Sequence, residues 1–407
     1  MLQSSDFRGK TRCEAIRCVL ARQLPSSCSM VEIQEITDLD ELAGYRLLWN
    51  SWLANAPRAT FFNTFDWLDN YWRHFGHNQR LRVLLVRSAG TPIGILPLCL
   101  RTEPHGFGSL RVLTYPLDGW GTWYGPIGAN PAVTMLAAMQ HVRQSSRDWD
   151  MIDLPSTAPP SRDGGRVGRS MCVVGLLSQQ TAYQTTSLVD LSGGWNSYLA
   201  GKSHKARHEM RRVLRRVFDS PDVEYIRHRP APAREGDGDP RWDLFAMCQQ
   251  VALASWQATS STGTTLTHER VGHFLRDAHA VAARNGMVDV NLLLVDGRPA
   301  AFAYNYHFHG RLTGLRVGYD ASLGQSGLGT ALMLRSIEDS CERGDVSLDL
   351  GPGETPFKRR LRTHSEASYR MIYAPLASWR SQAVRFSRWA RRRLGPAKSE
   401  VGKAASA

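Results

Sequence analysis

Residues 312–358 read LTGLRVGYDASLGQSGLGTALMLRSIEDSCERGDVSLDLGPGETPFK, and the rest of the chain is interpreted around them. The apolar pattern predicts a strand over Leu312–Tyr319. The loop Asp320–Gly327 is rich in glycine and serine, and it opens onto an amphipathic helix from about Leu328 to Glu342. A second, short strand is predicted over Val346–Leu350. The stretch therefore predicts a strand–loop–helix–strand unit.

The loop before this helix has the features of an anion site. Unpaired N–H groups and the positive end of the helix dipole converge at a helix N-terminus. Small residues at Ser326, Gly327 and Gly329 would let a phosphate approach the backbone closely. The alternative is an ordinary glycine-rich turn before a helix. On the first interpretation, the residues that hold the cofactor are Gln325, Ser326, Gly327, Leu328, Gly329 and Thr330.

These motifs resemble the GNAT acyltransferases, in which a strand, a Gln/Arg-x-x-Gly-x-Gly/Ala loop and a helix hold the pyrophosphate of acetyl-CoA. Gly327 and Gly329 supply the Gly-x-Gly, whereas Gly324 occupies the Gln/Arg position and Gln325 lies one residue late. The chain resembles more closely the CelD-type branch of bacterial acyltransferases, which is itself similar to the FemAB peptidyltransferases. The resemblance extends over residues 31–373 and implies acetyl-CoA or another acyl-CoA as co-substrate.

The CelD-type branch also has a strand that ends in Asp-Phe-Gly and a Gly-x-x-x-Tyr-Lys segment. This chain has Asp349-Leu350-Gly351 and then Gly353-Glu354-Thr355-Pro356-Phe357-Lys358, so Phe357 replaces the usual tyrosine. The resemblance therefore implies a GNAT family N-acetyltransferase, an acyltransferase for groups other than aminoacyl.

Composition limits the class of protein and of partner. The 407 residues are enough for two domains, and no apolar run approaches the roughly 20 residues that span a bilayer. The net charge of +13 favours an anionic partner such as CoA, a phosphorylated substrate, nucleic acid or a membrane surface. The seven cysteines are scattered, which indicates neither a zinc site nor a disulfide framework and fits a reducing, cytoplasmic compartment.

The order of predicted elements occurs twice. Helices, a hairpin, a strand, a loop, a helix and a strand follow one another over residues 38–154 and again over 242–350. The hairpin turns Ala89–Pro92 and Asp296–Pro299 correspond to each other. The predicted fold class is mixed α/β, a tandem pair of GNAT-like domains, each a mixed sheet flanked by helices. The first copy has Gly125-Pro126-Ile127-Gly128 in place of Gly-x-Gly, so we expect it to have lost cofactor binding.

The repeat and the composition predict six segments. They are a disordered or non-native extension (1–29), an N-terminal degenerate GNAT-like domain (30–165), a linker with a strand (166–194), a basic helix (195–220), the C-terminal acyltransferase domain (221–376) and a basic C-terminal helix with a tail (377–407).

Two segments concentrate positive charge. In Trp195–Phe218 an apolar stripe leaves Arg211 and Arg215 on the other side, where they either steer an anionic substrate or only solvate a packed helix. The helix expected over 378–394 could contact a membrane surface or nucleic acid, or cap the first domain. The aromatic stripe in Phe61–Phe75 is interpreted as core in preference to a ligand platform.

Acyl transfer needs a base for the acceptor and stabilisation of the oxyanion. The candidate bases are Asp349, Asp320 and Glu354, and Asp349 is preferred because a carboxylate in an apolar strand is costly unless it is paired or functional. Its alternative role is to orient the turn that follows. Tyr319 could protonate the departing thiolate, although a core tyrosine is the alternative.

The remaining candidates concern substrate phosphates and metals. Lys358 and the arginines in 359–362 are expected to bind phosphates. His307 and His309 have no third ligand nearby in the sequence, so no metal is expected.

Three functions fit these observations. The first is transfer of an acyl group, acetyl in the simplest case, from CoA to an amine or hydroxyl of a polar, saccharide-linked acceptor, as in polysaccharide biosynthesis. The second is Fem-like aminoacyl transfer from charged tRNA. The third is a non-catalytic scaffold that binds an anion, nucleic acid or a membrane.

Overall fold

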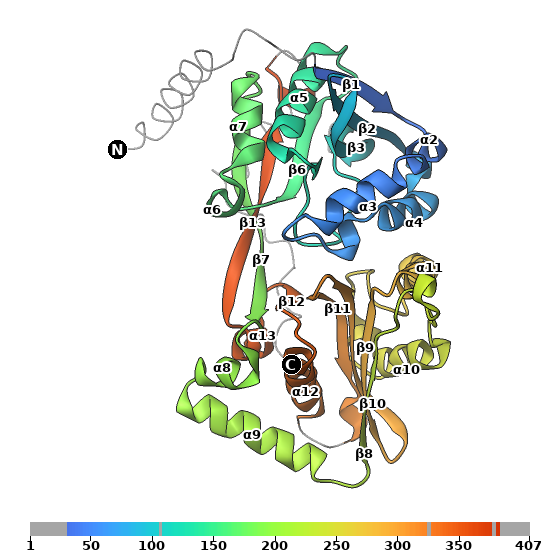
Figure 1. Cartoon of the computed structure of the whole chain (residues 1–407), viewed down its shortest axis with the longest axis vertical. Coiled ribbons are helices and arrows are strands. Elements are labelled where there is room, and N and C mark those ends of the chain that lie inside the picture. Colours follow the sequence, from blue (N-terminus) through green and yellow to red (C-terminus); the bar gives the residue numbers. More distant parts are fainter. Residues whose placement is uncertain (1–30, 106–107, 324–326, 377–379, 383–407) are drawn as a thin grey trace. The chain divides into compact units, whose positions relative to one another are not determined.

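The structure is a computed structural model that describes residues 31–105, 108–323, 327–376 and 380–382. It divides into two compact units, whose elements are labelled in Figure 1. Unit 1 contains residues 1–56, 71–184 and 367–407, and unit 2 contains residues 57–70 and 185–366. Two strands, β7 (Gln179–Asp190) and β13 (His364–Tyr373), contribute residues to both units.

Unit 1 is built on the strand order β1-β2-β3-β4-β6-β13. Neighbouring strands are antiparallel except β4 and β6, which pair in parallel at Val112↔Met151 and Leu113↔Ile152. The elements are β1 (Val31–Ile36), α2 (Leu39–Ala43), α3 (Arg46–Ala54), α4 (Phe65–Phe75, shared with unit 2), β2 (Gln79–Ser88), β3 (Thr91–His105), β4 (Gly108–Thr114), β5 (Ile127–Gly128), α5 (Pro131–Gln144), β6 (Met151–Thr157), α6 (Pro160–Asp163) and α7 (Arg166–Val173).

Unit 2 is built on the strand order β7-β12-β11-β10-β9-β8. Only β11 and β12 are parallel among these neighbours. The elements are η1 (Phe61–Asn63), α8 (Gly194–Ala200), α9 (His204–Phe218), β8 (Val223–His228), η3 (Ala233–Glu235), α10 (Trp242–Leu253), η4 (Trp256–Thr259), α11 (Glu269–Arg284), β9 (Val288–Val295), β10 (Arg298–Phe308), β11 (Arg311–Tyr319), η5 (Ala321–Leu323), α12 (Leu328–Glu342), β12 (Ser347–Pro352) and α13 (Pro356–Leu361).

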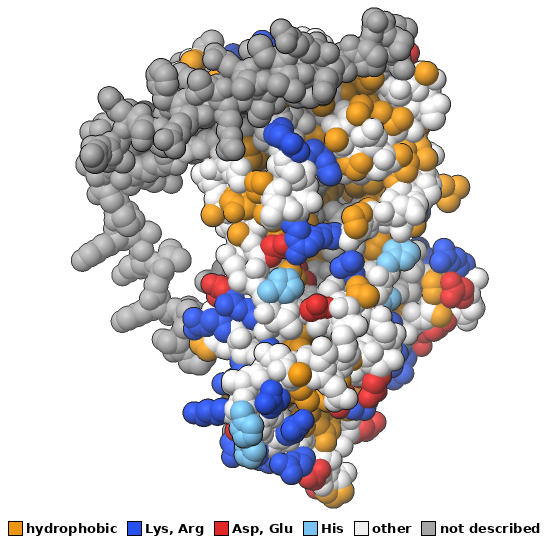
Figure 2. All heavy atoms as spheres, turned by 60° about the vertical axis from the view of Figure 1, so that its left-hand side comes forward, with side chains coloured by type: hydrophobic (Ala, Val, Ile, Leu, Met, Phe, Trp, Pro, Cys, Tyr) orange, Lys and Arg blue, Asp and Glu red, His pale blue; other side chains and the backbone are white. Residues whose placement is uncertain are grey.

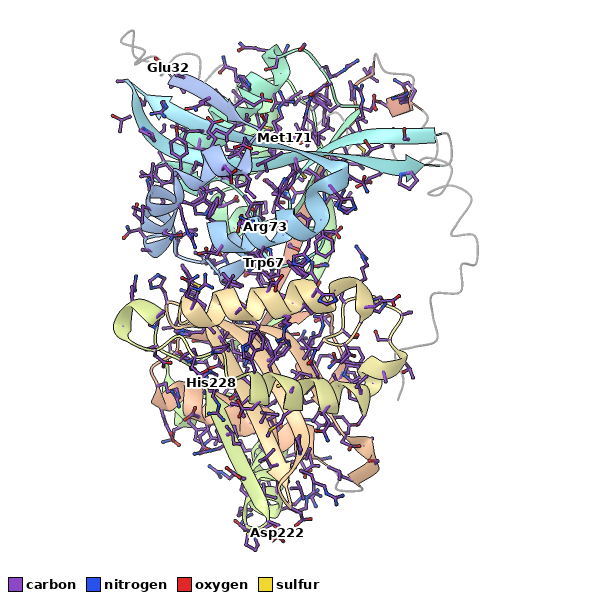
Figure 3. All side chains as sticks on the ribbon, turned by 90° about the vertical axis from the view of Figure 1, so that its right-hand side faces the viewer. Glu32, Trp67, Arg73, Met171, Asp222 and His228 are labelled. Atoms are coloured by element: carbon purple, nitrogen blue, oxygen red, sulfur yellow. The ribbon has the colours of Figure 1, made fainter. Side chains whose placement is uncertain are left out.

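Helices cover both faces of the unit 2 sheet, with α9 and α12 on one side and α10 and α11 on the other (Figure 1). Successive side chains of a strand point to opposite faces, so β10 alternates between two cores. Ala301 and Ala303 join the apolar cluster formed with α9 and α12. Tyr304 points the other way, and its hydroxyl lies 2.7 Å from Nδ1 of His279 on α11. Figure 3 shows α10 and α11 lying across this second face.

The aromatic stripe predicted in 61–75 is core, as expected. Phe61, Phe62 and Trp67 are buried. Trp67, labelled in Figure 3, packs its ring 5.0 Å from that of Phe274 on α11, and the Phe61 and Tyr306 ring centroids are 4.5 Å apart. These contacts place residues 57–70 in unit 2, whereas the sequence predicts them in the N-terminal domain.

A buried ion-pair network fixes the C-terminal part of α12 against the sheet. Arg227 on β8 contacts Asp289 on β9 at 2.8 Å and Asp339 on α12 at 2.6 Å. Arg229 contacts Asp345 at 2.7 Å. Buried charges of this kind are tolerated only when they are paired, and breaking such a pair costs about 3–5 kcal/mol. The network therefore helps to hold α12, whose other end forms the candidate site.

The predicted fold class is confirmed: both units are mixed α/β, and they repeat one order of elements. In each unit two helices, a hairpin, a strand and a helix lead to a strand that pairs in parallel, β4 with β6 and β11 with β12. The hairpin turns also match, because Ala89 and Gly90 have positive φ, as do Asp296 and Gly297.

Several elements differ from the sequence interpretation. The loop and linker expected over 155–194 contains α7, whose residues Val167 and Met171 are buried. The basic segment 195–218 forms two helices, since Ser203 caps α9 by accepting a hydrogen bond from the Ala206 amide. Of the helix expected over 378–394 only residues 380–382 are described, and the extension 1–29 lies outside the described residues. Within the described residues, no helix combines the length and the apolar character needed to cross a membrane.

Three cysteines among the described residues, Cys99, Cys248 and Cys341, are free thiols.

Candidate active site

The parallel strands β11 and β12 part in the middle of unit 2. Their described pairing covers only Arg311↔Ser347, Leu312↔Leu348 and Thr313↔Asp349, although β11 continues to Tyr319. The pairing of β10 with β11 has a bulge at this point, because Tyr304 pairs with Arg316 and Asn305 pairs with Gly314. The bulge changes the direction of the end of β11. The two strands therefore diverge before β11 reaches the predicted loop.

Gly314 allows the close approach of the strands just before they part. A Cβ at this position would lie 3.0 Å from the Asp349 carbonyl oxygen. Real Cβ atoms rarely come that close to backbone, so a side chain here would push β12 away.

The N-terminus of α12 lies at the end of this divergence. Gly327 caps the helix with φ +96°, a left-handed conformation that favours glycine. A Cβ on Gly327 would lie 2.7 Å from a guanidinium nitrogen of Arg216 on α9. A Cβ on Gly329 would lie 3.2 Å from the Tyr319 ring. The first turn of α12 is therefore bordered by a cation and an aromatic ring.

The predicted cofactor residues fall into three groups. Gly327 and Gly329 present backbone at the first turn, with Thr330 half-buried beside them. The Leu328 side chain is fully buried in the core, so only its backbone could contact a ligand. Gln325 and Ser326 lie outside the described residues.

Asp349 is buried on β12, at the last position that pairs with β11. Its Oδ1 accepts hydrogen bonds from the Thr186 hydroxyl at 2.6 Å and from the Gly351 amide at 2.7 Å. Gly351 has φ +81°, a conformation in which a residue other than glycine would be strained. The hydrogen bond from its amide therefore holds a glycine turn in place. The carboxylate thus orients the following turn, which is the alternative role considered from the sequence.

Lys358 lies beside the same turn. Its ammonium group donates to the Pro352 carbonyl oxygen at 2.6 Å. Burial lowers the pKa of Lys358, and the negative charge of Asp349 acts in the opposite direction. The structure therefore brings Asp349 and Lys358 together at the end of β12.

The other predicted catalytic residues are spread over the surrounding loops. Oδ1 of Asp320 accepts from the Ser322 amide at 2.8 Å and caps η5. Glu354 forms an ion pair with Arg362. Tyr319 is 47% exposed at the end of β11, so it is not the core tyrosine that the sequence offered as an alternative.

Sequence reasoning missed the loop between α10 and α11, which is anchored on β11. Arg316 donates from Nε to the Thr264 carbonyl oxygen at 2.7 Å, and the Trp256 indole donates to the Val317 carbonyl oxygen at 3.1 Å. Burial lowers the pKa of Arg316 to about 10. The sequence does contain a signal, because Arg316, like Asp349, is a charged residue in an apolar strand, where a charge is costly unless it is paired or functional.

The basic surface of α9 is exposed, as predicted. Met210, Val213 and Val217 face the core, and Arg211 and Arg215 face solvent without an ion pair to a described residue. Figure 2 shows Lys and Arg side chains gathered over the lower part of the face that it presents. Arg216, however, is the α9 residue that lies against the loop.

Comparison with known proteins supports the fold of this site. Residues 204–359 match the family model described as Acetyltransferase (GNAT) domain, and the match runs from α9 into α13. The matched segment has a GNAT-type fold. No curated protein sequence matches the chain.

Solved structures are similar over most of the chain at low identity. The crystal structure of FemX is 9% identical with a TM-score of 0.57, covering 88% of this chain and 99% of that one. The C-terminal domain of a putative lysylphosphatidylglycerol synthetase from Agrobacterium fabrum is 13% identical with a TM-score of 0.53, covering 87% and 98%. A conserved protein of unknown function from Bacteroides thetaiotaomicron is 12% identical with a TM-score of 0.52, covering 85% and 100%. These likenesses concern the fold.

Proposed function

We propose that this protein is an acyltransferase that moves an acyl group, acetyl in the simplest case, from CoA to an amine or hydroxyl of a polar acceptor. The observation that carries the proposal is the divergence of β11 and β12 beyond Thr313 and Asp349, beside the N-terminus of α12. Backbone groups that leave a sheet ladder can pair with an extended ligand, and the amide-containing arm of CoA is such a ligand. The α12 N-terminus suits its pyrophosphate.

In this proposal the acceptor attacks the thioester carbon, a base takes the acceptor proton and the thiolate leaves. We assign the base to Asp349, which lies at the point of divergence. Tyr319, at the end of β11 and against Gly329, would return a proton to the thiolate. Lys358 would bind a phosphate or stabilise negative charge near Asp349.

In this proposal the acceptor binds beside the loop between α10 and α11. Trp256 is 56% exposed although its indole N–H is held by Val317, two residues before Tyr319. An exposed aromatic ring that is fixed in place provides an apolar surface with a polar edge, which suits a sugar ring. We therefore propose that the acceptor is saccharide-linked and that the chain belongs to the CelD-type branch. We also propose a cytoplasmic location.

The second candidate is aminoacyl transfer from charged tRNA. It is favoured by the likeness in fold to FemX and by the exposed cations Arg211 and Arg215, which could meet a phosphate backbone. The two candidates differ in the donor that binds.

Isothermal titration with acetyl-CoA and with total tRNA tests the proposal. We expect saturable binding of acetyl-CoA and, with amino-sugar or polysaccharide acceptors, release of free CoA thiol. Saturable binding of tRNA without binding of acetyl-CoA would replace this proposal with the aminoacyl alternative. Binding of neither donor would leave a non-catalytic scaffold.

A further inference from the structure

Unit 2 contains a pocket of about 500 Å³ that the proposed chemistry does not use. It is lined by α8, the start of α9, α13 and the residues that follow α13. Along α9 it lies away from the candidate active site, because Ala206 lines the pocket whereas Arg216 approaches Gly327. At a rise of 1.5 Å per residue these two positions are about 15 Å apart.

The wall of this pocket is held by side chains from α8 and the turn after it. The Tyr198 hydroxyl donates to the Leu361 carbonyl oxygen at 2.8 Å. The Lys202 ammonium donates to the carbonyl oxygens of Leu361 at 2.8 Å and Arg362 at 2.6 Å, and it lies 4.6 Å from the Tyr198 ring centroid. Burial lowers the pKa of Lys202 to about 8. These contacts fix the end of α13 and therefore the place of its arginines.

The charges around the pocket do not balance. Arg359 and Arg360 are exposed and form no ion pair with a described residue. Arg362 is paired with Glu354. One carboxylate lines the pocket, that of Asp190, and its Oδ1 accepts from the amide and the hydroxyl of Ser192. Neither guanidinium group therefore has an ion-pair partner among the described residues, although the Glu209 carboxylate acts on Arg360 at longer range.

We propose that this pocket binds a phosphate group carried by a substrate. A guanidinium group is planar and always charged, and its fork of donors matches the oxygens of a phosphate. Ser197 adds a hydroxyl group to the same lining, whereas the Thr363 hydroxyl already donates to the Leu188 carbonyl oxygen. The phosphate has two sources in the proposed reaction, the 3′-phosphate of CoA or a phosphate on the acceptor. That assignment to a substrate rests on the proposed acyltransferase function, whereas binding of free pyrophosphate does not.

Titration of inorganic pyrophosphate into the whole protein tests the pocket, and the variant separates the pocket from the first turn of α12, which could bind the same anion. The variant is Arg359→Gln with Arg360→Gln. The matched control is Arg284→Gln with Arg298→Gln, two exposed unit 2 arginines that likewise form no ion pair with a described residue and do not line the pocket. We expect the pocket variant to lose at least tenfold in affinity and the control to change less than twofold. Equal affinity in wild type and both variants, or no binding by the wild type at millimolar pyrophosphate, would overturn the proposal.

Comparison of CoA with 3′-dephospho-CoA identifies the source of the phosphate. If the pocket holds the 3′-phosphate, wild type prefers CoA and the Arg359→Gln, Arg360→Gln variant does not. If the pocket holds a phosphate of the acceptor, the wild type and the variant prefer CoA over 3′-dephospho-CoA to the same degree. Pyrophosphate then competes with the acceptor. If the wild-type protein binds pyrophosphate in the pocket but does not bind CoA, the proposed acyltransferase function is refuted and the proposed phosphate site is not.

Discussion

At Asp349 a catalytic and a positioning role make different predictions for one substitution. Asparagine can accept the same hydrogen bonds from Thr186 and Gly351 through its amide oxygen, but it cannot take a proton. As a general base, Asp349→Asn should lower kcat by about 10²–10⁴ and remove the acidic limb of the pH–rate profile. The measurement is kcat against pH for both proteins, with circular dichroism as the folding control. An unchanged profile with a near wild-type rate would leave Asp349 a positioning role only.

His279 makes stability depend on pH. It is fully buried in unit 2, with Nδ1 against Tyr304 and Nε2 2.5 Å from the Pro240 carbonyl oxygen. Burial lowers its pKa from 6.5 to about 4. Between these values the unfolded state binds the proton and the folded state does not, so stability is complete above pH 6.5 and falls as the pH approaches 4.

The contribution of His279 can be measured by urea unfolding at several pH values. The pKa difference corresponds to a loss of about 3 kcal/mol by pH 4. His279→Gln should be less stable at pH 8 but should show a smaller loss between pH 6.5 and 4. Identical pH slopes for the two proteins would contradict the buried neutral imidazole.

At the scale of elements, the first turn of α12 is the most direct place to disturb a bound phosphate. Gly329→Asp would put a carboxylate among backbone N–H groups and against the Tyr319 ring. We expect at least a tenfold loss of CoA affinity by titration, with a melting temperature close to that of wild type. Gly327→Asp should also abolish CoA binding, but its positive φ adds strain and Arg216 could pair with the new carboxylate.

A control for this substitution exists on another helix of unit 2. A Cβ added at Gly272 on α11 would have no atom within 4 Å apart from its chain neighbours and the backbone of its own helix. Gly272→Asp therefore introduces the same charge in open space. If both aspartates weaken CoA binding equally, the effect is one of net charge and the site is not at α12.

The exposed face of α9 makes a kinetic prediction. If Arg211 and Arg215 steer an anionic ligand, changing both to Gln should slow association and leave dissociation nearly unchanged. The difference should shrink with salt, since the Debye length falls from about 10 Å at 0.1 M to about 3 Å at 1 M. Stopped-flow association of CoA at both salt concentrations measures this. Equal, salt-independent on-rates would give these arginines a purely solvating role, with each substitution changing stability by no more than about 0.5 kcal/mol.

The sequence could predict those features that depend on residues close to one another along the chain. The strand, loop and helix of 312–342 were predictable because apolar periodicity and glycine act within a few residues. The contacts of Asp349 with Thr186 and of Arg316 with Thr264 join residues 163 and 52 positions apart. No local pattern encodes such pairs, so the anchoring of the α10–α11 loop and the partner of the preferred base appeared only in the structure.

At the scale of the whole molecule, two units repeat one order of elements but differ at the loop before the helix that connects the two parallel strands. In unit 1 the residues before α5 are Gly128, Ala129 and Asn130, and the Asn130 side chain accepts from the Val133 amide. That bond occupies a donor at the N-terminus of α5. In unit 2 the cap is Gly327, which has no side chain that could occupy the N–H groups of the first turn of α12. This contrast supports the proposal that the first copy has lost cofactor binding.

Hydrogen–deuterium exchange with and without acetyl-CoA tests the central claim, because it reports every segment of both units at once. The account predicts that acetyl-CoA protects peptides from the end of β11, the first turn of α12 and the end of β12, while the equivalent peptides of β4, α5 and β6 exchange at unchanged rates. Protection confined to β4, α5 and β6, or no protection at saturating acetyl-CoA, would contradict it.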